Sequence, residues 1–139
     1  MDADAARRHL LGKRHEWVCR ALDCAASVAA GWDGPATTDR ERVVPPYRAT
    51  LRRAGVLEAA PTVLGECVAA AGERLAADPV AAPPYVVVTG EGLLLRATLD
   101  KRLLVWVRAF RLRRTAGGGS RRYERVATDP EGAVAVETI

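Results

Sequence analysis

The chain has 139 residues, of which 49% are hydrophobic and 27% are charged, a composition typical of a single globular domain. This composition excludes a disordered chain, a collagen and a disulfide-stabilised miniprotein. The formal net charge is +4, yet residues 1–84 are neutral because their 11 basic side chains are balanced by 11 acidic ones. The excess lies in residues 101–125, where the only acidic residue is Glu124, and such a basic block can attract an anionic partner.

Residues 1–77 are predicted to be helical. Apolar residues from Leu10 to Ala29 recur at three- and four-residue intervals, which places them on one face of a helix. Asp2 and Asp4 suit the start of this helix, and Gly31 suits its end because glycine readily takes the left-handed conformation. We expect two more helices, which run from about Pro46 to Gly55 and from Glu58 or Pro61 to Ala77.

From Tyr85 onward the hydrophobic pattern alternates with a period of two, which predicts β-strands. The expected strands are Tyr85–Thr89, Leu93–Leu99, Arg102–Arg113, Arg121–Ala127 and Ala133–Thr138, with a flexible loop at Thr115–Ser120. The predicted fold class is therefore α+β, with about three N-terminal helices followed by an antiparallel meander of four to five strands. We expect one domain over residues 1–139, with a helical half (1–77) and a sheet half (85–139).

The register of the central hairpin decides which side chains share a face. A three-residue turn through Arg102 pairs Leu99 with Leu103 and Ala97 with Val105, and it creates one wholly apolar face. A two-residue turn at Asp100 and Lys101 would instead mix polar and apolar residues. Because burial selects the apolar face, the sequence predicts the three-residue turn, which also pairs Leu95 with Val107.

The opposite face of this hairpin is too apolar for an ordinary solvated face. It carries Leu94, Arg96, Thr98, Leu104, Trp106, Arg108, Phe110 and Leu112. Three interpretations stay open: the chain's own helices or its last strand cover this face, a second copy or another protein binds it, or it binds nucleic acid. The third would use Trp106 and Phe110 to stack bases, with arginines for the phosphates. The candidate interaction surface consists of Arg96, Leu104, Trp106, Arg108, Phe110 and Leu112.

A second candidate site is a group of arginines around the predicted loop. If Thr115–Ser120 joins two paired strands, five guanidinium groups gather at one end: Arg111, Arg113, Arg114, Arg121 and Arg122. Like charges gathered at one end of a hairpin repel each other. We therefore expect the acidic tail (Asp129, Glu131 and Glu137) to fold back, or an anion to bind, unless the arginines spread apart in solvent.

Neither a catalytic nor a metal-binding signature stands out. The chain contains no Asn or Gln, and His15, Cys19 and Asp23 form only a weak metal pattern, because no second His or Cys pair completes it. We expect no catalytic residue, no metal and no cofactor, and an enzymatic role is not favoured. Three cysteines without a CxxC motif, no signal peptide and no membrane span predict a cytoplasmic protein.

Parts of the sequence also resemble a known group of proteins. The segments Gly31–Arg40, Val44–Pro46, Leu51–Leu57, Ala82–Thr89 and Leu94–Asp100 resemble a family of small uncharacterised haloarchaeal proteins, over about residues 25–112. The resemblance implies no activity, cofactor or site. The leading hypothesis is a small non-enzymatic protein that acts through a protein–protein or self-association surface on its sheet. The alternative is a nucleic-acid-binding accessory protein that uses residues 101–125.

Overall fold

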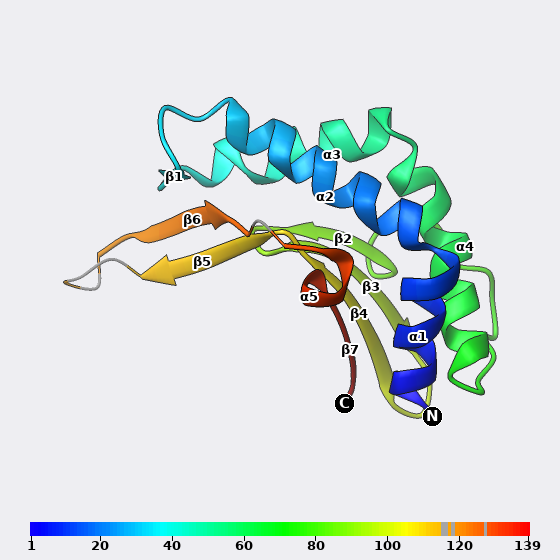
Figure 1. Cartoon of the computed structure of the whole chain (residues 1–139). Helices are drawn as coiled ribbons and strands as arrows, with labels where there is room; N and C mark the ends of the chain where they lie inside the picture. The colour runs from blue at the N-terminus through cyan, green and yellow to red at the C-terminus, as the bar shows by residue number, and fades with distance from the viewer. Residues whose placement is uncertain (115–116, 118, 127) are drawn as a thin grey trace.

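The computed structural model describes residues 1–114, 117, 119–126 and 128–139, and it confirms the α+β fold class (Figure 1). The helices are α1 (Ala3–Lys13), α2 (His15–Ala30), the 3-10 helix η1 (Arg40–Arg42), α3 (Val44–Arg53), α4 (Val56–Ala70) and α5 (Pro130–Ala133). The strands are β1 (Ala36–Thr37), β2 (Val86–Thr89), β3 (Gly92–Thr98), β4 (Arg102–Arg108), β5 (Phe110–Arg114), β6 (Arg121–Arg125) and β7 (Val134–Thr138). Figure 1 shows α1 to α4 on one side of the strands.

The predicted first helix consists of two helices, α1 and α2, which meet at Arg14. Asp2 caps α1 by accepting a hydrogen bond of 2.9 Å from a backbone N–H of the first turn. At Arg14 the backbone leaves the helical conformation, with φ −122°, and its side chain bonds to Glu66 on α4. Gly31 does not take the left-handed conformation that the sequence predicts, since its φ is −84°. Its N–H donates to a carbonyl in the last turn of α2, and this bond does not require the left-handed conformation.

Prolines and glycines define the next two helices. Pro45–Pro46 lies in the first turn of α3, where the missing N–H groups are not needed. Between α3 and α4, Gly55 takes φ +78°, a conformation that favours glycine. α4 ends at Ala70, well before the predicted end at Ala77, because Gly72 takes φ +85° and closes the helix.

The larger sheet has the strand order β2-β3-β4-β7, and all of its pairs are antiparallel. A three-residue turn joins β3 to β4, but it spans Leu99–Lys101, so Ala97 pairs with Leu103. The predicted pairing of Ala97 with Val105 is therefore wrong by two residues, because the N–H of Leu99 bonds the carbonyl of Lys101 and closes the turn earlier. A shift of two residues preserves the faces, so Leu93, Leu95, Ala97, Leu103, Val105 and Val107 are all buried in the core, as predicted.

β4 continues into β5 through a β-bulge at Ala109. The N–H groups of Ala109 and Phe110 both donate to the carbonyl of Glu91, at 3.0 and 3.1 Å. Ala109 and Phe110 therefore both lie opposite the single residue Glu91. After such a bulge, the alternation of side chains between the two faces of the strand shifts by one position. The single strand predicted over Arg102–Arg113 is therefore interrupted, and Phe110 lies on the core side of the sheet.

Beyond the bulge, β5 and β6 form a hairpin that leaves the larger sheet, and β1 pairs with β6 to give the order β1-β6-β5 (Figure 1). β7 then returns to pair with β4 rather than continuing from β6, so the strands form two sheets instead of one meander. Residues 115, 116 and 118 of the predicted loop Thr115–Ser120 lie outside the described residues, as does Ala127, the predicted end of β6.

The core lies between the helices and the larger sheet. Tyr47 of α3 is fully buried there, and its hydroxyl donates to the carbonyl of Ala21 at 3.1 Å. Burial raises the pKa of Tyr47, so the phenol stays neutral. Phe110 meets the Tyr47 ring edge-on, with 5.1 Å between ring centres, and lies 5.9 Å from the ring of Trp32. The bulge therefore fixes an aromatic cluster beneath α2 and α3.

The termini meet at the other end of the core. Arg7 of α1 donates from Nε to the carbonyl of Val134 at 3.3 Å and from a terminal nitrogen to the carbonyl of Glu131 at 2.8 Å. Val134 belongs to β7, the strand at the edge of the larger sheet. A side chain of α1 therefore donates a hydrogen bond to a backbone carbonyl of that edge strand.

We predict that Gly92→Ala destabilises the fold by about 3 kcal/mol or more, because a side chain there collides with the bulge. Gly92 has φ +141°, and an added Cβ would lie 2.9 Å from the backbone nitrogen of Ala109 and closer still to the carbonyl of Val107. Urea denaturation should show a clearly lower midpoint. Gly12→Ala is the matched control, since it has open space inside α1 and should leave the midpoint equal or higher. An unchanged midpoint for Gly92→Ala would contradict the packing of the bulge.

Candidate functional site

The side of the larger sheet that faces away from α1 to α4, here the outer face, is the main candidate site. Strand register places Leu94, Trp106 and Ala135 side by side across β3, β4 and β7. A second row contains Arg96, Leu104 and Glu137, in the same strand order. Leu94 is only 5% exposed although it lies outside the core cluster, whereas Leu104 and Trp106 are half-buried. The outer face is therefore an apolar centre with an arginine on one flank and a carboxylate on the other.

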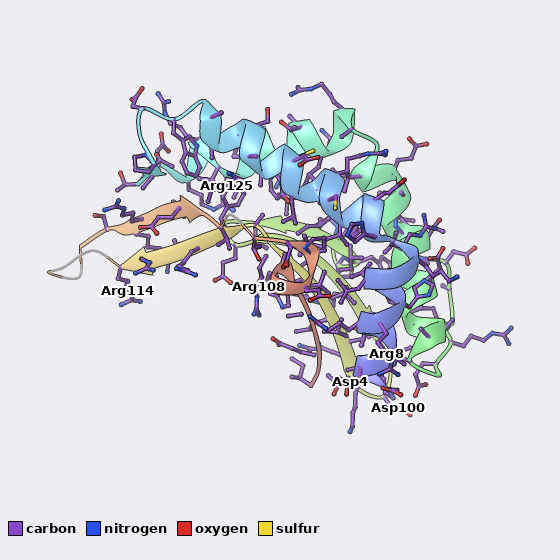
Figure 2. The ribbon with its side chains drawn as sticks, in the orientation of Figure 1. Asp4, Arg8, Asp100, Arg108, Arg114 and Arg125 are labelled. Carbon is purple, nitrogen blue, oxygen red and sulfur yellow. The ribbon has the colours of Figure 1, made fainter. Side chains whose placement is uncertain are left out.

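Two arginines on this face lack part of their hydrogen bonding. Arg108 covers the Trp106 ring, with 5.2 Å between its guanidinium carbon and the ring centre, and donates to Oε1 of Glu137 at 3.1 Å. In the described part of the chain, the Nε atoms of Arg96 and Arg108 are buried without a hydrogen-bond partner. Figure 2 shows Arg108 on the side of β4 away from the helices. Buried polar atoms are nearly always paired, so these two nitrogens are exceptions within the described residues.

The structure keeps four of the six residues of the predicted interaction surface together and separates two. Arg96, Leu104, Trp106 and Arg108 share the outer face. Phe110 does not, because the bulge turns it into the core, where it is 2% exposed. Leu112 follows it on β5 and packs against the core as a partly buried residue. The stacking role considered for Phe110 is thereby lost.

Sequence reasoning missed Glu137 and Ala135 as members of this face. The predicted meander placed the last strand after β6, whereas β7 lies beside β4. The sequence predicted a strand over Ala133–Thr138, but nothing in its pattern identified β4 as the neighbouring strand.

The predicted arginine site lies on the hairpin of β5 and β6, and all five of its members are exposed. Register places Arg113 opposite Arg122 and Arg114 opposite Arg121. Because side chains alternate between the two faces of a strand, Arg111, Arg113 and Arg122 share one face with Glu124, and Arg114 and Arg121 share the other. Glu124 forms ion pairs with Arg113 at 3.5 Å and with Arg122 at 3.2 Å.

The acidic tail is engaged elsewhere on the molecule. Asp129 caps α5 by accepting from the N–H of Gly132 at 2.9 Å. Glu137 pairs with Arg108, and the carbonyl of Glu131 accepts from Arg7. Within the described residues, the structure therefore gives Glu124 rather than the tail as the carboxylate that pairs with the hairpin arginines.

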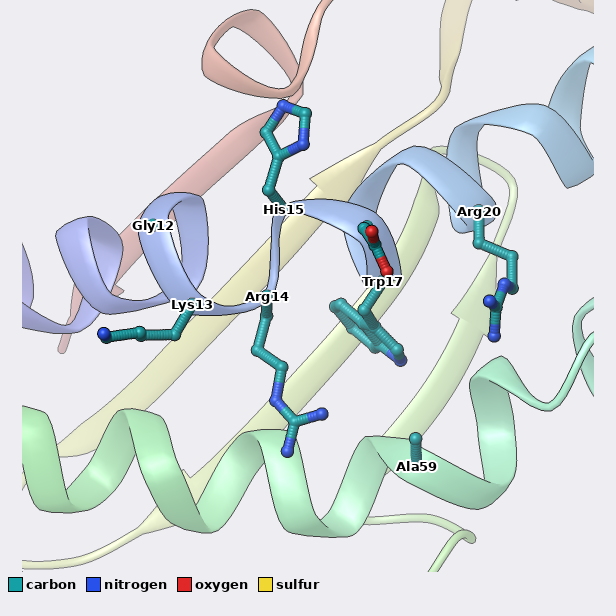
Figure 3. A pocket seen from close by; sticks show the side chains of 8 residues that line it. Gly12, Lys13, Arg14, His15, Trp17, Arg20 and Ala59 are labelled. Atoms are coloured by element: carbon teal, nitrogen blue, oxygen red, sulfur yellow. The ribbon is translucent and has the colours of Figure 1, made fainter.

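A cleft of about 530 Å³ lies where α1 meets α2 (Figure 3). Figure 3 shows Arg14 and Trp17 directed toward α4, whereas His15 points away from α4. Glu66 of α4 binds Arg14 through two hydrogen bonds, one of 2.9 Å from Nε and a shorter one from Nη2, and it contacts His9 at 2.8 Å. The cations around this cleft therefore do not converge on one ligand.

The other chemical candidates remain isolated. The Cys19 sulfur lies 3.7 Å from Nδ1 of His15 on the exposed side of α2. Over the residues that the structure describes, no group of three His, Cys, Asp or Glu side chains is placed to hold a metal ion. Cys67 is buried in the core, and burial raises its pKa to about 12, which keeps its thiol protonated. None of the helices described here combines the length and apolarity that a membrane span requires.

Comparisons with known proteins place this site within a family. The model of a family described as a domain of unknown function matches residues 4–139, so it includes the helices and both sheets. No curated protein and no solved structure matches the chain. The haloarchaeal source implied by the sequence resemblance stays a prediction.

We predict that Glu66→Gln destabilises the protein by about 1–2 kcal/mol at neutral pH. The hydrogen bond from Arg14 is the main cause that lowers the pKa of Glu66 from 4.5 to about 2; burial opposes the shift, and His9 adds to it. A carboxylate with a lowered pKa stabilises the fold above its ordinary pKa, and this stability is lost as the pH falls from 4.5 toward 2.

Thermal unfolding between neutral pH and pH 2 checks this prediction. The variant should lose less stability over the acid range than the unmodified chain. Glu58→Gln removes the same charge from an exposed position on α4 and serves as the control. Parallel acid profiles for Glu66→Gln and the unmodified chain would show that Glu66 is not the titrating group.

Proposed function

The chain belongs to that family, DUF7988, a domain of unknown function, and from its surface we propose that it is a small non-enzymatic protein-interaction module that binds another polypeptide through the outer face. The observation that carries the proposal is the apolar centre of Leu94, Leu104 and Trp106 on a sheet face opposite the helical layer. A sheet with one solvated face ordinarily alternates apolar and polar residues. An apolar centre on such a face is characteristic of a binding surface.

The composition of the outer face also favours a protein partner. Tryptophan and arginine are the residues that most often dominate binding energy at protein interfaces. Here Trp106 lies at the centre, with Arg96 and Arg108 on the neighbouring positions. Both arginines are charged donors, so this face favours a partner that supplies hydrogen-bond acceptors. The cytoplasmic location expected from the sequence is part of this proposal.

Binding of nucleic acid is the second candidate, and the exposed arginines of the β5–β6 hairpin favour it. Arg114 stands opposite Arg121, a like-charge pair that a phosphate would relieve. A stacking platform on the sheet, however, has lost Phe110 to the core, and Arg108 covers the ring of Trp106. The aromatic contacts that such platforms need are therefore not free, and a polypeptide is the better-supported partner.

Site-specific photo-crosslinking tests the proposed function. We expect benzoylphenylalanine in place of Trp106 to form an adduct of one defined mass in cells. The same probe in place of Arg52, an exposed residue of α3, should not form it. Arg96→Ala and Arg108→Ala should each reduce the adduct from position 106 by about fivefold or more, since each removes a flanking contact. The absence of an adduct, or the same adducts from positions 106 and 52, would contradict the proposal.

Filter binding of single-stranded DNA and RNA tests the second candidate. If the hairpin binds single-stranded nucleic acid through its five arginines, affinity should fall by about a hundredfold from about 50 to 200 mM salt. Replacing Arg113, Arg114, Arg121 and Arg122 by Ser should then abolish retention. Replacing Arg40, Arg42, Arg52 and Arg53 by Ser removes the same charge from the helical layer and should not. Retention that is absent or independent of salt rules this candidate out.

A further inference from the structure

We propose that the free edge of β2 is a second binding site, where an extended acidic peptide of another protein adds to the larger sheet as a further strand. β2 is the terminal strand of that sheet, so no strand among the described residues pairs with its other edge. The site is an edge rather than the outer face, so the inference goes beyond the proposed function. Strand addition of this kind takes affinity from main-chain hydrogen bonds and specificity from side chains.

A groove of about 220 Å³ lies at this edge, between β2, α3 and the segment Ala81–Pro83. Its lining includes Val86, Val87 and Val88, which are consecutive residues of β2. Successive side chains of a strand point to opposite faces, so a groove that contacts all three lies at the edge of the strand rather than over one face. The buried side chains of Val86, Val88 and Leu57 make its floor apolar.

The backbone of Val88 faces this groove. The N–H of Arg96 donates to the carbonyl of Tyr85 at 2.8 Å, so these two residues form a hydrogen-bonded pair of the ladder between β2 and β3. Such pairs alternate along an antiparallel ladder with pairs that lack hydrogen bonds. Val88 lies three residues after Tyr85, opposite Leu93, and therefore belongs to a pair of the second kind. Its N–H and C=O point away from β3.

Val86 has the same orientation, and its N–H already has a partner. That N–H donates to the carbonyl of Ala82 at 3.1 Å, so the segment before β2 covers the first part of the edge. Among the described residues, no backbone carbonyl plays the same part for the N–H of Val88. Buried backbone groups are nearly always paired, and a peptide strand can pair both groups of Val88 because each of its residues offers one N–H and one C=O.

The charge of the groove indicates that the peptide is acidic. Arg48 and Arg52 of α3 line the groove, and its lining contains no acidic residue. Within the described part of the chain, neither arginine forms an ion pair. They are four residues apart, which is about 6 Å along a helix axis. Alternate side chains of a strand are about 6.7 Å apart, so carboxylates on alternate residues of a peptide match this spacing.

A polypeptide fits the groove better than a nucleic acid does. The phosphates of a nucleic acid would supply acceptors for Arg48 and Arg52, but a phosphate diester carries no donor for the carbonyl of Val88. An extended acidic peptide supplies carboxylates for the arginines and main-chain groups for β2 at the same time. The groove therefore favours a peptide in which acidic residues alternate with apolar ones.

Fluorescence anisotropy with a labelled hexapeptide of alternating glutamate and valine tests the proposal. The unmodified chain should bind it saturably, and should bind the matched peptide of alternating lysine and valine about tenfold more weakly or worse. Arg48→Glu and Arg52→Glu should each raise the Kd by about tenfold or more, because each sets a carboxylate against those of the peptide. Arg8→Glu makes the same change at an exposed position of α1 and should leave the Kd unchanged. Circular dichroism shows whether each variant folds.

Two further measurements test the addition of a strand. Binding should slow the amide hydrogen exchange of Val88 by about tenfold or more, because its N–H gains an acceptor. N-methyl groups on all glutamates of the peptide, or instead on all of its valines, remove alternate rows of N–H groups. Only one row faces β2, so one methylated peptide should lose binding and the other should keep it.

The outcomes distinguish this site from the outer face. The proposal is overturned if the acidic peptide does not bind saturably, if both charge reversals leave the Kd unchanged, or if the exchange of Val88 stays the same. Binding of single-stranded DNA that Arg48→Glu abolishes, without binding of the peptide, also overturns it and assigns the groove to nucleic acid. Because Arg52 lines the groove, a photo-crosslinking probe at position 52 should give adducts that differ in mass from the adduct at position 106. The adduct at position 106 depends on none of these results.

Discussion

The pair of hydrogen bonds from Ala109 and Phe110 to the carbonyl of Glu91 is the contact on which the arrangement of the sheets depends. It turns Phe110 into the core against Tyr47 and directs β5 out of the larger sheet. The edge of β4 is then free for β7. Without that edge, Glu137 would not lie beside Leu104, and the outer face would have cations without a carboxylate.

The helical layer and the outer face differ in what their side chains contact. Burial of Tyr47, Trp17 and Phe110 beneath the helices holds the fold together, and the indole of Trp17 donates to the carbonyl of Val56 at 3.1 Å. The Arg14 and Glu66 pair fastens the break between α1 and α2 to α4. The helical layer therefore supplies stability, while Trp106 and the arginines of the outer face belong to the proposed binding surface.

Much of the fold could be predicted because hydrophobic period reports local structure directly. The period of two located the strands and the buried face of the β3–β4 hairpin, since a shift of two residues in pairing leaves the faces unchanged. The pattern could not report the bulge, because Arg108, Ala109 and Phe110 alternate like any strand. It also could not report that β7 pairs with β4, since the hydrogen bonds that decide this join residues far apart in sequence. The site was therefore found in its centre, Trp106 and Leu104, and missed at its flank, Glu137.

The contact of Arg7 with Val134 joins residues 127 positions apart and bears on how the protein is made. A chain emerging from the ribosome presents α1 first and β7 last. Until β7 has emerged, the edge of β4 is an unpaired template for other strands, and α1 lacks the sheet edge that it covers. The helices α2 to α4 and the hairpin of β3 and β4 can assemble earlier. Closure of the fold therefore waits for β7, and the nascent chain is most exposed to wrong strand pairing while β5 and β6 are being added.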